Sequence, residues 1–159
     1  MEVYAAIASK RDERRYAERP VSDEHVERIL DAGRLTGSSQ NTQRWEFVLV
    51  SEARDALAET VYAPANVRTA GLVVAIVGPA FPFDVGRCAQ NMMLAAWELG
   101  IVSCPNGVRD GERAAEICGG DVRIILSFGY RPRPRAERSA DEWSARANRR
   151  PLSELVRRA

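Results

Sequence analysis

The stretch GLVVAIVG, residues 71–78, decides the fold that this sequence predicts. It is a continuous apolar run, rich in β-formers and bounded by a glycine at each end, and it is far too short to span a bilayer. A strand without polar alternation has both of its faces covered. We therefore expect a central strand here, with other elements packed on both sides of its sheet.

Helices and strands alternate on either side of this run. Apolar residues recur at steps of three and four between residues 83 and 100, which predicts a long helix that Gly100 ends. The other expected strands are 45–50, 101–104 and 122–130, and the other expected helices are 2–9, 23–33, 52–62, 110–120 and 152–158, with Ser22 and Ser51 as N-caps. This alternation predicts an α/β or α+β sandwich with a mixed sheet.

The length and charge bound the classes of protein that are possible. A chain of 159 residues with 45% hydrophobic and 28% charged residues suits one globular domain, residues 1–159. The net charge of +1 gives no overall field that favours nucleic acid or an anionic membrane. Residues 131–159 form an extended arm in this interpretation, because arginines and prolines replace the hydrophobic pattern after Tyr130.

Few side chains of this sequence could carry chemistry alone. The three cysteines, Cys88, Cys104 and Cys118, lie at irregular spacing without a CxxC, and the one histidine, His25, is expected on the outer face of a helix. We expect no metal site and no catalytic side chain, so a cofactor would carry any reaction. The beginning of the chain has no apolar segment of the signal-peptide kind, and we expect a cytoplasmic protein.

Two polar segments suggest what kind of cofactor this would be. The loop GSSQNTQRW, residues 37–45, is rich in uncharged hydrogen-bonding side chains, and the segment KRDERRY, residues 10–16, is rich in guanidinium groups. Flavin mononucleotide (FMN) is bound by this mixture of groups. Cations bind its phosphate, and hydroxyls and amides bind its ribityl chain and its pyrimidine edge. Other phosphorylated ligands have similar demands, so composition leaves them open.

The order of several segments resembles the nitroreductase family of FMN-dependent oxidoreductases along nearly the whole chain. These segments are KRDERRY (10–16), GSSQNTQRW (37–45), QNMMLAAWELG (90–100), FGY (128–130) and NRRPLSELV (148–156). The resemblance implies an α+β fold (an α/β/α sandwich) with a mixed, mainly antiparallel central sheet flanked by helices. It also implies a homodimer in which the C-terminal arm, 131–159, wraps the partner subunit.

The resemblance also implies roles for individual residues. Lys10, Arg11, Arg149 and Arg150 would bind the phosphate, with Arg14 near N1 and O2 of the ring. Ser38, Ser39 and Asn41 would reach the flavin of the partner subunit, and Gln43 would support the ring or the loop. Asn66 would bind the pyrimidine edge of the flavin. The segment Pro105, Asn106 and Gly107 would lie beside flavin N5.

This chain departs from the family pattern in three ways. Asp12 stands where the family has a serine, and its carboxylate would repel a phosphate unless it turned to Arg11 or Arg14. Both prolines of the family's polar loop are absent. The connections before and after residues 71–78 are short, so the flavin would be less covered.

The function that we expect is an FMN-dependent oxidoreductase. NADH or NADPH would reduce the flavin, which would then reduce a nitro compound, a quinone or a similar small acceptor. The alternative is a flavin-binding module, a carrier, sensor or degenerate paralogue, without efficient turnover. A third interpretation, in which the arginine arm contacts an acidic partner or nucleic acid, is disfavoured by the neutral total charge.

Overall fold

The computed structural model describes residues 2–134 and 136–158 of the chain. Its centre is a four-stranded sheet in the order β1-β2-β4-β3. The strands are β1 (Glu46–Leu49), β2 (Leu72–Val77), β3 (Ile101–Asn106) and β4 (Val122–Tyr130). Neighbouring strands all pair antiparallel, and the parallel component is the isolated bridge between Asp12 and Ser103. The predominantly antiparallel α+β sandwich is therefore confirmed.

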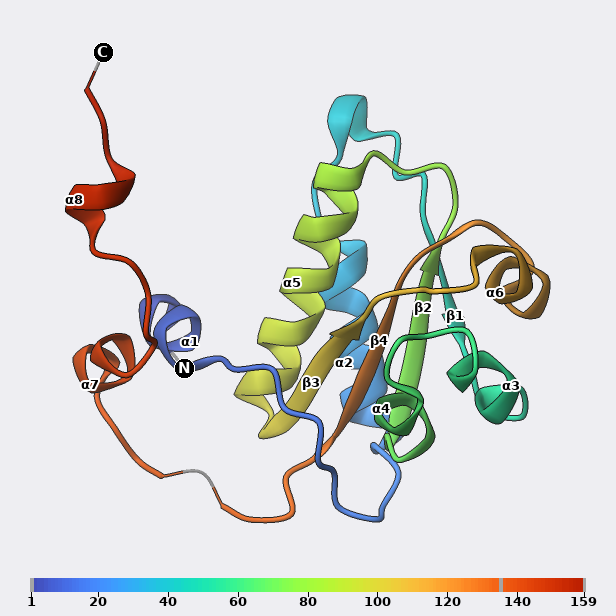
Figure 1. Ribbon diagram of the computed structural model, residues 1–159, viewed down its shortest axis with the longest axis horizontal. Coiled ribbons are helices and arrows are strands. Elements are labelled where there is room, and N and C mark those ends of the chain that lie inside the picture. The colour runs from blue at the N-terminus through green and yellow to red at the C-terminus, as the bar shows by residue number, and fades with distance from the viewer. Residues whose placement is uncertain (1, 135, 159) are drawn as a thin grey trace.

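The strand β2 is the centre that the apolar run predicts. All six of its residues are buried, between β1 on one side and β4 on the other. One face of the sheet packs against α2 (Asp23–Arg34) and α5 (Pro82–Glu98), and the other lies under α3 (Arg54–Ala58), α4 (Pro64–Arg68) and α6 (Gly111–Cys118) (Figure 1). Two separate hydrophobic clusters fill these faces, so both sides of β2 contribute to burial.

Several of the expected boundaries were wrong. The segment 52–62 is not one helix but the short α3, with Ala53 rather than Ser51 at its N-cap, followed by α4, which begins at Pro64. Ser22 is at the N-cap position of α2, as expected, but its side chain makes no cap hydrogen bond and its hydroxyl accepts from Tyr130 at 3.4 Å. The strand β3 continues two residues beyond Cys104, since β4 extends the antiparallel ladder to Asn106.

The two ends of the chain meet away from the sheet. The helices α1 (Val3–Ser9) and α7 (Ala140–Ala145) pack together, and α8 (Leu152–Leu155) continues outward from them (Figure 1). We call these three helices the terminal lobe. The sequence did not lead us to expect α7, although Ser139 and Glu142 form the capping box that starts it.

Arg11 ties the lobe to the rest of the chain. Its Nη1 donates to the carbonyls of Ala8 and Lys10, each at 2.8 Å, and its Nη2 donates to the carbonyl of Trp143 at 3.0 Å. The guanidinium also lies 5.7 Å from the centre of the Trp143 ring. These contacts join α7 to the segment that follows α1.

Candidate functional site

A buried polar network lies where β3 ends. The Asn66 amide donates to Asn106 Oδ1 at 3.1 Å, and the Asn106 amide donates to the carbonyl of Cys104 at 3.0 Å and to Ser127 Oγ at 3.0 Å. The Tyr16 hydroxyl lies 2.8 Å from the same Ser127 Oγ. Two of the residues expected at the site, Asn66 and Asn106, are thus brought together and held by hydrogen bonds.

Burial changes the acidity of the groups in this network. It raises the pKa of Tyr16 to about 12, so the phenol stays protonated at neutral pH. Burial also raises the pKa of the Cys104 thiol, against the smaller opposing influence of the Arg14 guanidinium and the Lys10 ammonium. A neutral thiol is a poor nucleophile, so the network offers hydrogen bonds and no reactive group.

The extended segment 10–16 runs beside this network. Asp12 bridges to Ser103 of β3, and the backbone N–H of Glu13 donates to the Ser103 carbonyl at 3.0 Å. The Asp12 carboxylate pairs with Lys10, and not with Arg11 or Arg14, the two partners considered from the sequence. Lys10 sits close to Asp12 because its stem is buried against α5, where its ammonium lies 3.5 Å from Met93 Sδ.

The polar loop lies at the opposite end of α5. Its short turn η1 (Ser39–Asn41) is held there because the backbone N–H of Ser39 donates to Asp84 Oδ2 at 3.0 Å. Ser38 Oγ accepts from the backbone N–H of Gln43 at 2.9 Å, and the Gln43 amide donates to Asn41 Oδ1 at 3.2 Å. Gln40, Asn41 and Gln43 have positive φ angles of 53°, 54° and 48°, a conformation that is unfavourable for residues other than glycine.

One chain does not bring the two polar segments together. Lys10 contacts α5 at Met93, and Ser39 contacts it at Asp84. At about 1.5 Å of rise per residue, these positions are about 14 Å apart along the helix axis. Figure 1 shows the turn at one end of α5 and the N-terminal segment near the other.

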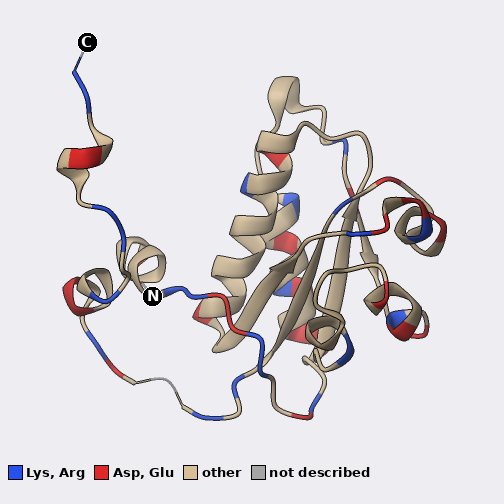
Figure 2. Cartoon of the chain, in the orientation of Figure 1, with Lys and Arg blue, Asp and Glu red and all other residues tan. Residues whose placement is uncertain are grey.

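The two arm arginines are also remote from the network. Arg149 and Arg150 are exposed in the connection between α7 and α8, and Arg150 pairs with Glu154 at 3.2 Å. Figure 2 shows further basic residues along this arm and along the segment after α1. The structure therefore groups Lys10, Asp12, Arg14, Asn66, Pro105, Asn106 and Gly107 at one end, and it places Ser38, Ser39, Asn41, Gln43, Arg149 and Arg150 elsewhere.

Sequence reasoning missed Tyr16 and Ser127. Residues 10, 12, 14 and 16 alternate along an extended segment, and this alternation could have placed Tyr16 beside the other three. Tyr16 also packs on Gly129, where an added Cβ would come within 2.7 Å of the tyrosine ring. No local sequence pattern indicates Ser127, because only the register between β3 and β4 places it beside Asn106.

Other candidate groups have structural partners. His25 is half-buried and its Nδ1 lies 2.9 Å from the Tyr130 hydroxyl, so it is not on the outer face as we expected. All three cysteines are buried and free. Within residues 2–134 and 136–158, no cluster of histidine, cysteine and acidic side chains could hold a metal ion, and no helix is long and apolar enough to cross a membrane.

Comparison with known proteins decides the family. A profile described as "Nitroreductase family" matches residues 7–79 and 78–130, which is most of the chain. This chain belongs to the nitroreductase family.

Relatives of this nitroreductase-family chain match it over most of their length. The "Putative NADH dehydrogenase/NAD(P)H nitroreductase" of Archaeoglobus fulgidus is 29% identical over 89% of this chain and 91% of its own. A nitroreductase structure from Desulfovibrio desulfuricans, solved in complex with FMN, has a TM-score of 0.82 at 24% identity, covering 100% of this chain and 98% of that one. The NADPH:FMN oxidoreductase of Vibrio harveyi, complexed with NAD+, has a TM-score of 0.79 at 21% identity, covering 96% and 75%. The two structures show a shared fold.

Proposed function

We propose that this protein is an FMN-dependent oxidoreductase that uses NADH or NADPH to reduce nitro compounds, quinones or similar small acceptors. The observation that carries the proposal is the family match over residues 7–130, joined to a buried amide network beside an arginine-rich segment. The relative named for NAD(P)H and the fold neighbours with FMN and NAD+ support the choice of cofactor and reductant. A reaction that draws on reduced nicotinamides suits the cytoplasm.

The donor set fits FMN in kind. Arg14 offers an exposed guanidinium near the network, and Ser39 and Asn41 offer exposed polar groups on a strained loop. The Asn66 amide donates to Asn106, and the Asn106 amide donates to strand carbonyls and to Ser127, so the backbone of residues 105–107 is held in place beside the proposed ring. No single chain assembles these groups around one ligand, because the loop and the segment 10–16 lie at opposite ends of α5.

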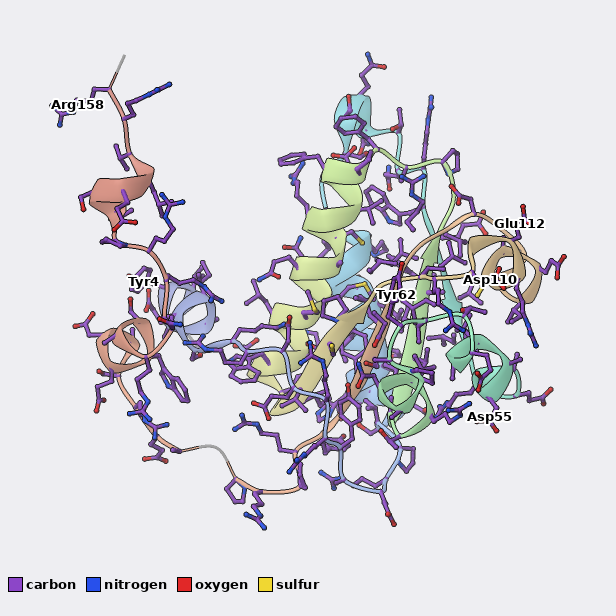
Figure 3. The ribbon with its side chains drawn as sticks, in the orientation of Figure 1. Tyr4, Asp55, Tyr62, Asp110, Glu112 and Arg158 are labelled. Atoms are coloured by element: carbon purple, nitrogen blue, oxygen red, sulfur yellow. The ribbon has the colours of Figure 1, made fainter. Side chains whose placement is uncertain are left out.

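A homodimer would complete the site. Large apolar side chains on the terminal lobe are exposed, among them Tyr4 (56%), Ile7 (56%) and Leu152 (76%). Figure 3 shows Tyr4 on α1 and Arg158 near the end of the arm, both well away from the sheet. Exposed apolar side chains gathered on a projecting lobe favour burial against another molecule, and a second copy that wraps its arm around the first would bury them.

In this dimer, the residues of one subunit would bind the phosphate and the pyrimidine edge, and the loop of the other would close over the ribityl chain. Lys10 and the arm residues Arg149 and Arg150 would neutralise the phosphate, and Arg14 would lie near N1 and O2 of the ring. Arg11 would join them only by leaving its three carbonyls, so we assign it first to the lobe. Asn66 would bind the pyrimidine edge, and Pro105, Asn106 and Gly107 would lie beside flavin N5, with Gly107 close to Tyr62. The bound flavin would supply hydride acceptance and donation, and the protein would supply orientation and positive charge.

A flavin-binding module without efficient turnover is the second candidate. The ion pair between Asp12 and Lys10 favours it, because this carboxylate reduces the positive charge available to a phosphate.

One experiment separates these functions. The purified full-length protein is examined for bound flavin and for its mass by light scattering, and NADH or NADPH is then added without air. We expect a yellow dimer that bleaches. A yellow protein that keeps its colour supports the binding module, and a colourless protein that takes up no added FMN contradicts both.

A further inference from the structure

A cavity of about 610 Å³ lies between the polar loop and the connection from β2 to α5. Its walls include Ser38 and Ser39 of the loop, and Phe81 and Phe83 at the start of α5. This volume is in the range of sites that enclose a small organic molecule. The loop residues lining it are those that we assign to the flavin of the partner subunit, so a ligand here would lie near the reacting ring.

The apolar walls of the cavity are aromatic. Phe81 and Phe83 are 65% and 66% exposed, although Ala80 and Val85 beside them are buried. Trp45, half-buried, adds a third ring. Exposed aromatic faces around a cavity favour an aromatic ligand, because stacked or edge-to-face rings gain energy beyond their buried area.

The cavity also carries excess positive charge. Arg44 and Arg87 line it, against the single carboxylate of Asp84. That carboxylate is buried, accepts from the backbone N–H of Ser39 and lies 3.8 Å from Arg87 Nη1, so its charge is largely compensated. The N-terminus of the long helix α5, at Pro82, adds its partial positive charge at the same wall.

The Arg87 side chain and the Arg44 backbone each have a defined place at the cavity wall. The Arg87 guanidinium lies over Gly37, where an added Cβ would come within 3.0 Å of Nη2, and 5.6 Å from the Phe83 ring centre. The Arg44 carbonyl lies against Gly78, where an added Cβ would come within 2.8 Å of it. A guanidinium beside aromatic side chains can bind a carboxylate through two hydrogen bonds while the ring that carries the carboxylate packs on those side chains.

We propose that this cavity binds aromatic carboxylates and so makes a nitrobenzoate-like anion the preferred acceptor. The proposal rests on the proposed function, because it names the class of compound that the flavin would reduce. Phe81, Phe83 and Trp45 contact the ring, and Arg44 and Arg87 bind the carboxylate.

Binding of 4-nitrobenzoate and of uncharged nitrobenzene, measured by calorimetry on the full-length protein with its flavin oxidised, tests the proposal. We expect 4-nitrobenzoate to bind at least about tenfold more tightly, because it alone makes charge-assisted hydrogen bonds with the arginines. Raising the salt concentration weakens its binding and leaves that of nitrobenzene unchanged.

Substitutions test whether the preference for 4-nitrobenzoate comes from the residues that line the cavity. Arg44→Gln and Arg87→Gln each weaken 4-nitrobenzoate binding by about tenfold and change nitrobenzene binding by less than about twofold. Phe83→Leu weakens both ligands. Arg34→Gln, which removes an exposed guanidinium outside the cavity, changes neither. Arg44→Gln does not touch the Asp84 contacts, so it remains informative if Arg87→Gln disturbs the loop.

Equal affinity for the two compounds, or unchanged affinity for 4-nitrobenzoate in Arg44→Gln and Arg87→Gln, overturns the proposal. So does the absence of 4-nitrobenzoate binding, as expected if a second copy fills the cavity. These results leave the proposed function standing when NADH or NADPH bleaches the protein. A colourless protein that still prefers 4-nitrobenzoate removes the proposed function and keeps the binding site.

Discussion

Asn66 donates its side-chain amide to Asn106 Oδ1 at 3.1 Å, across the interface between α4 and the end of β3. Asn106 in turn donates to the carbonyls of Cys104 and Ile125 and to Ser127 Oγ. Both asparagines are more than nine-tenths buried. One amide therefore joins a helix, two strands and a serine hydroxyl in a place without access to water.

This network predicts a large cost for Asn106→Ala. The change removes a side-chain amide whose two N–H groups and one oxygen serve four partners, and it leaves the Ile125 carbonyl and the Asn66 amide without this partner, which should lower the free energy of unfolding by about 2–4 kcal/mol. Urea denaturation measures it. Gln90→Ala, on the exposed face of α5, is the control and should cost less than about 0.5 kcal/mol. Equal stabilities of the two variants would contradict the role given to the network.

Tyr16 should make the protein sensitive to alkaline pH. Its pKa is raised from 10.0 to about 12 by burial, so the folded protein holds this proton more tightly than the unfolded chain does. The stabilisation that comes from Tyr16 is complete below pH 10.0 and is lost as the pH rises toward about 12. Ultraviolet titration of tyrosinate should therefore show one late component, which Tyr16→Phe removes.

The thiols must be separated from this effect. Cys88, whose pKa burial raises to about 11, also destabilises the fold as the pH rises from 9.0 toward that value. The difference in unfolding free energy between the wild type and Tyr16→Phe cancels this common part. If this difference in unfolding free energy stays constant between about pH 9 and about pH 11, the pKa of Tyr16 is not raised as its burial requires.

The long apolar elements could be predicted from the sequence, because hydrophobic burial alone decides them. The run at 71–78 and the helix at 83–100 are both present as β2 and α5. The helix α7 was missed because it has little hydrophobic periodicity: it starts from a local capping box and packs on α1 of the same chain.

The candidate site was less predictable than the fold. Lys10, Arg14, Asn66 and Asn106 lie at one end of the sheet, and their roles at a flavin stay a prediction. Arg11 was expected at a phosphate, but a guanidinium beside a helix end also satisfies carbonyls, and here it bonds to three. Which of these roles an arginine takes depends on contacts remote in sequence, and no local pattern encodes them.

Arg11 should hold the arm in place. Arg11→Ala removes the hydrogen bond to the Trp143 carbonyl and the contact with its ring, so the arm should open more often. A loss of about 1–2 kcal/mol of local stability raises the rate of tryptic cleavage in residues 131–150 roughly 5- to 30-fold. Arg113→Ala, exposed on α6, should leave that rate unchanged. Equal rates for both variants would mean that other contacts hold α7.

Two helical glycines should respond in opposite directions to alanine. At Gly33 of α2, an added Cβ would lie 2.8 Å from Phe47 Cζ and 2.9 Å from Met92 Cγ, so Gly33→Ala forces apart α2, α5 and β1. Overpacking of this kind should lower the free energy of unfolding by about 1–3 kcal/mol. At Gly86 of α5 no atom lies within 4 Å of an added Cβ, so Gly86→Ala should raise it by up to about 1 kcal/mol through helix propensity.

Urea denaturation of both glycine variants over a series of protein concentrations measures these changes, and the pair tests how the helices pack. The series is needed because Gly86 is exposed, and a second copy packed on α5 would turn its gain into a loss that grows as the dimer forms. A stabilised Gly33→Ala would show that α2 and α5 are farther apart than the Met92 contact requires. A destabilised Gly86→Ala at every concentration would instead place another part of the same chain over the exposed face of α5.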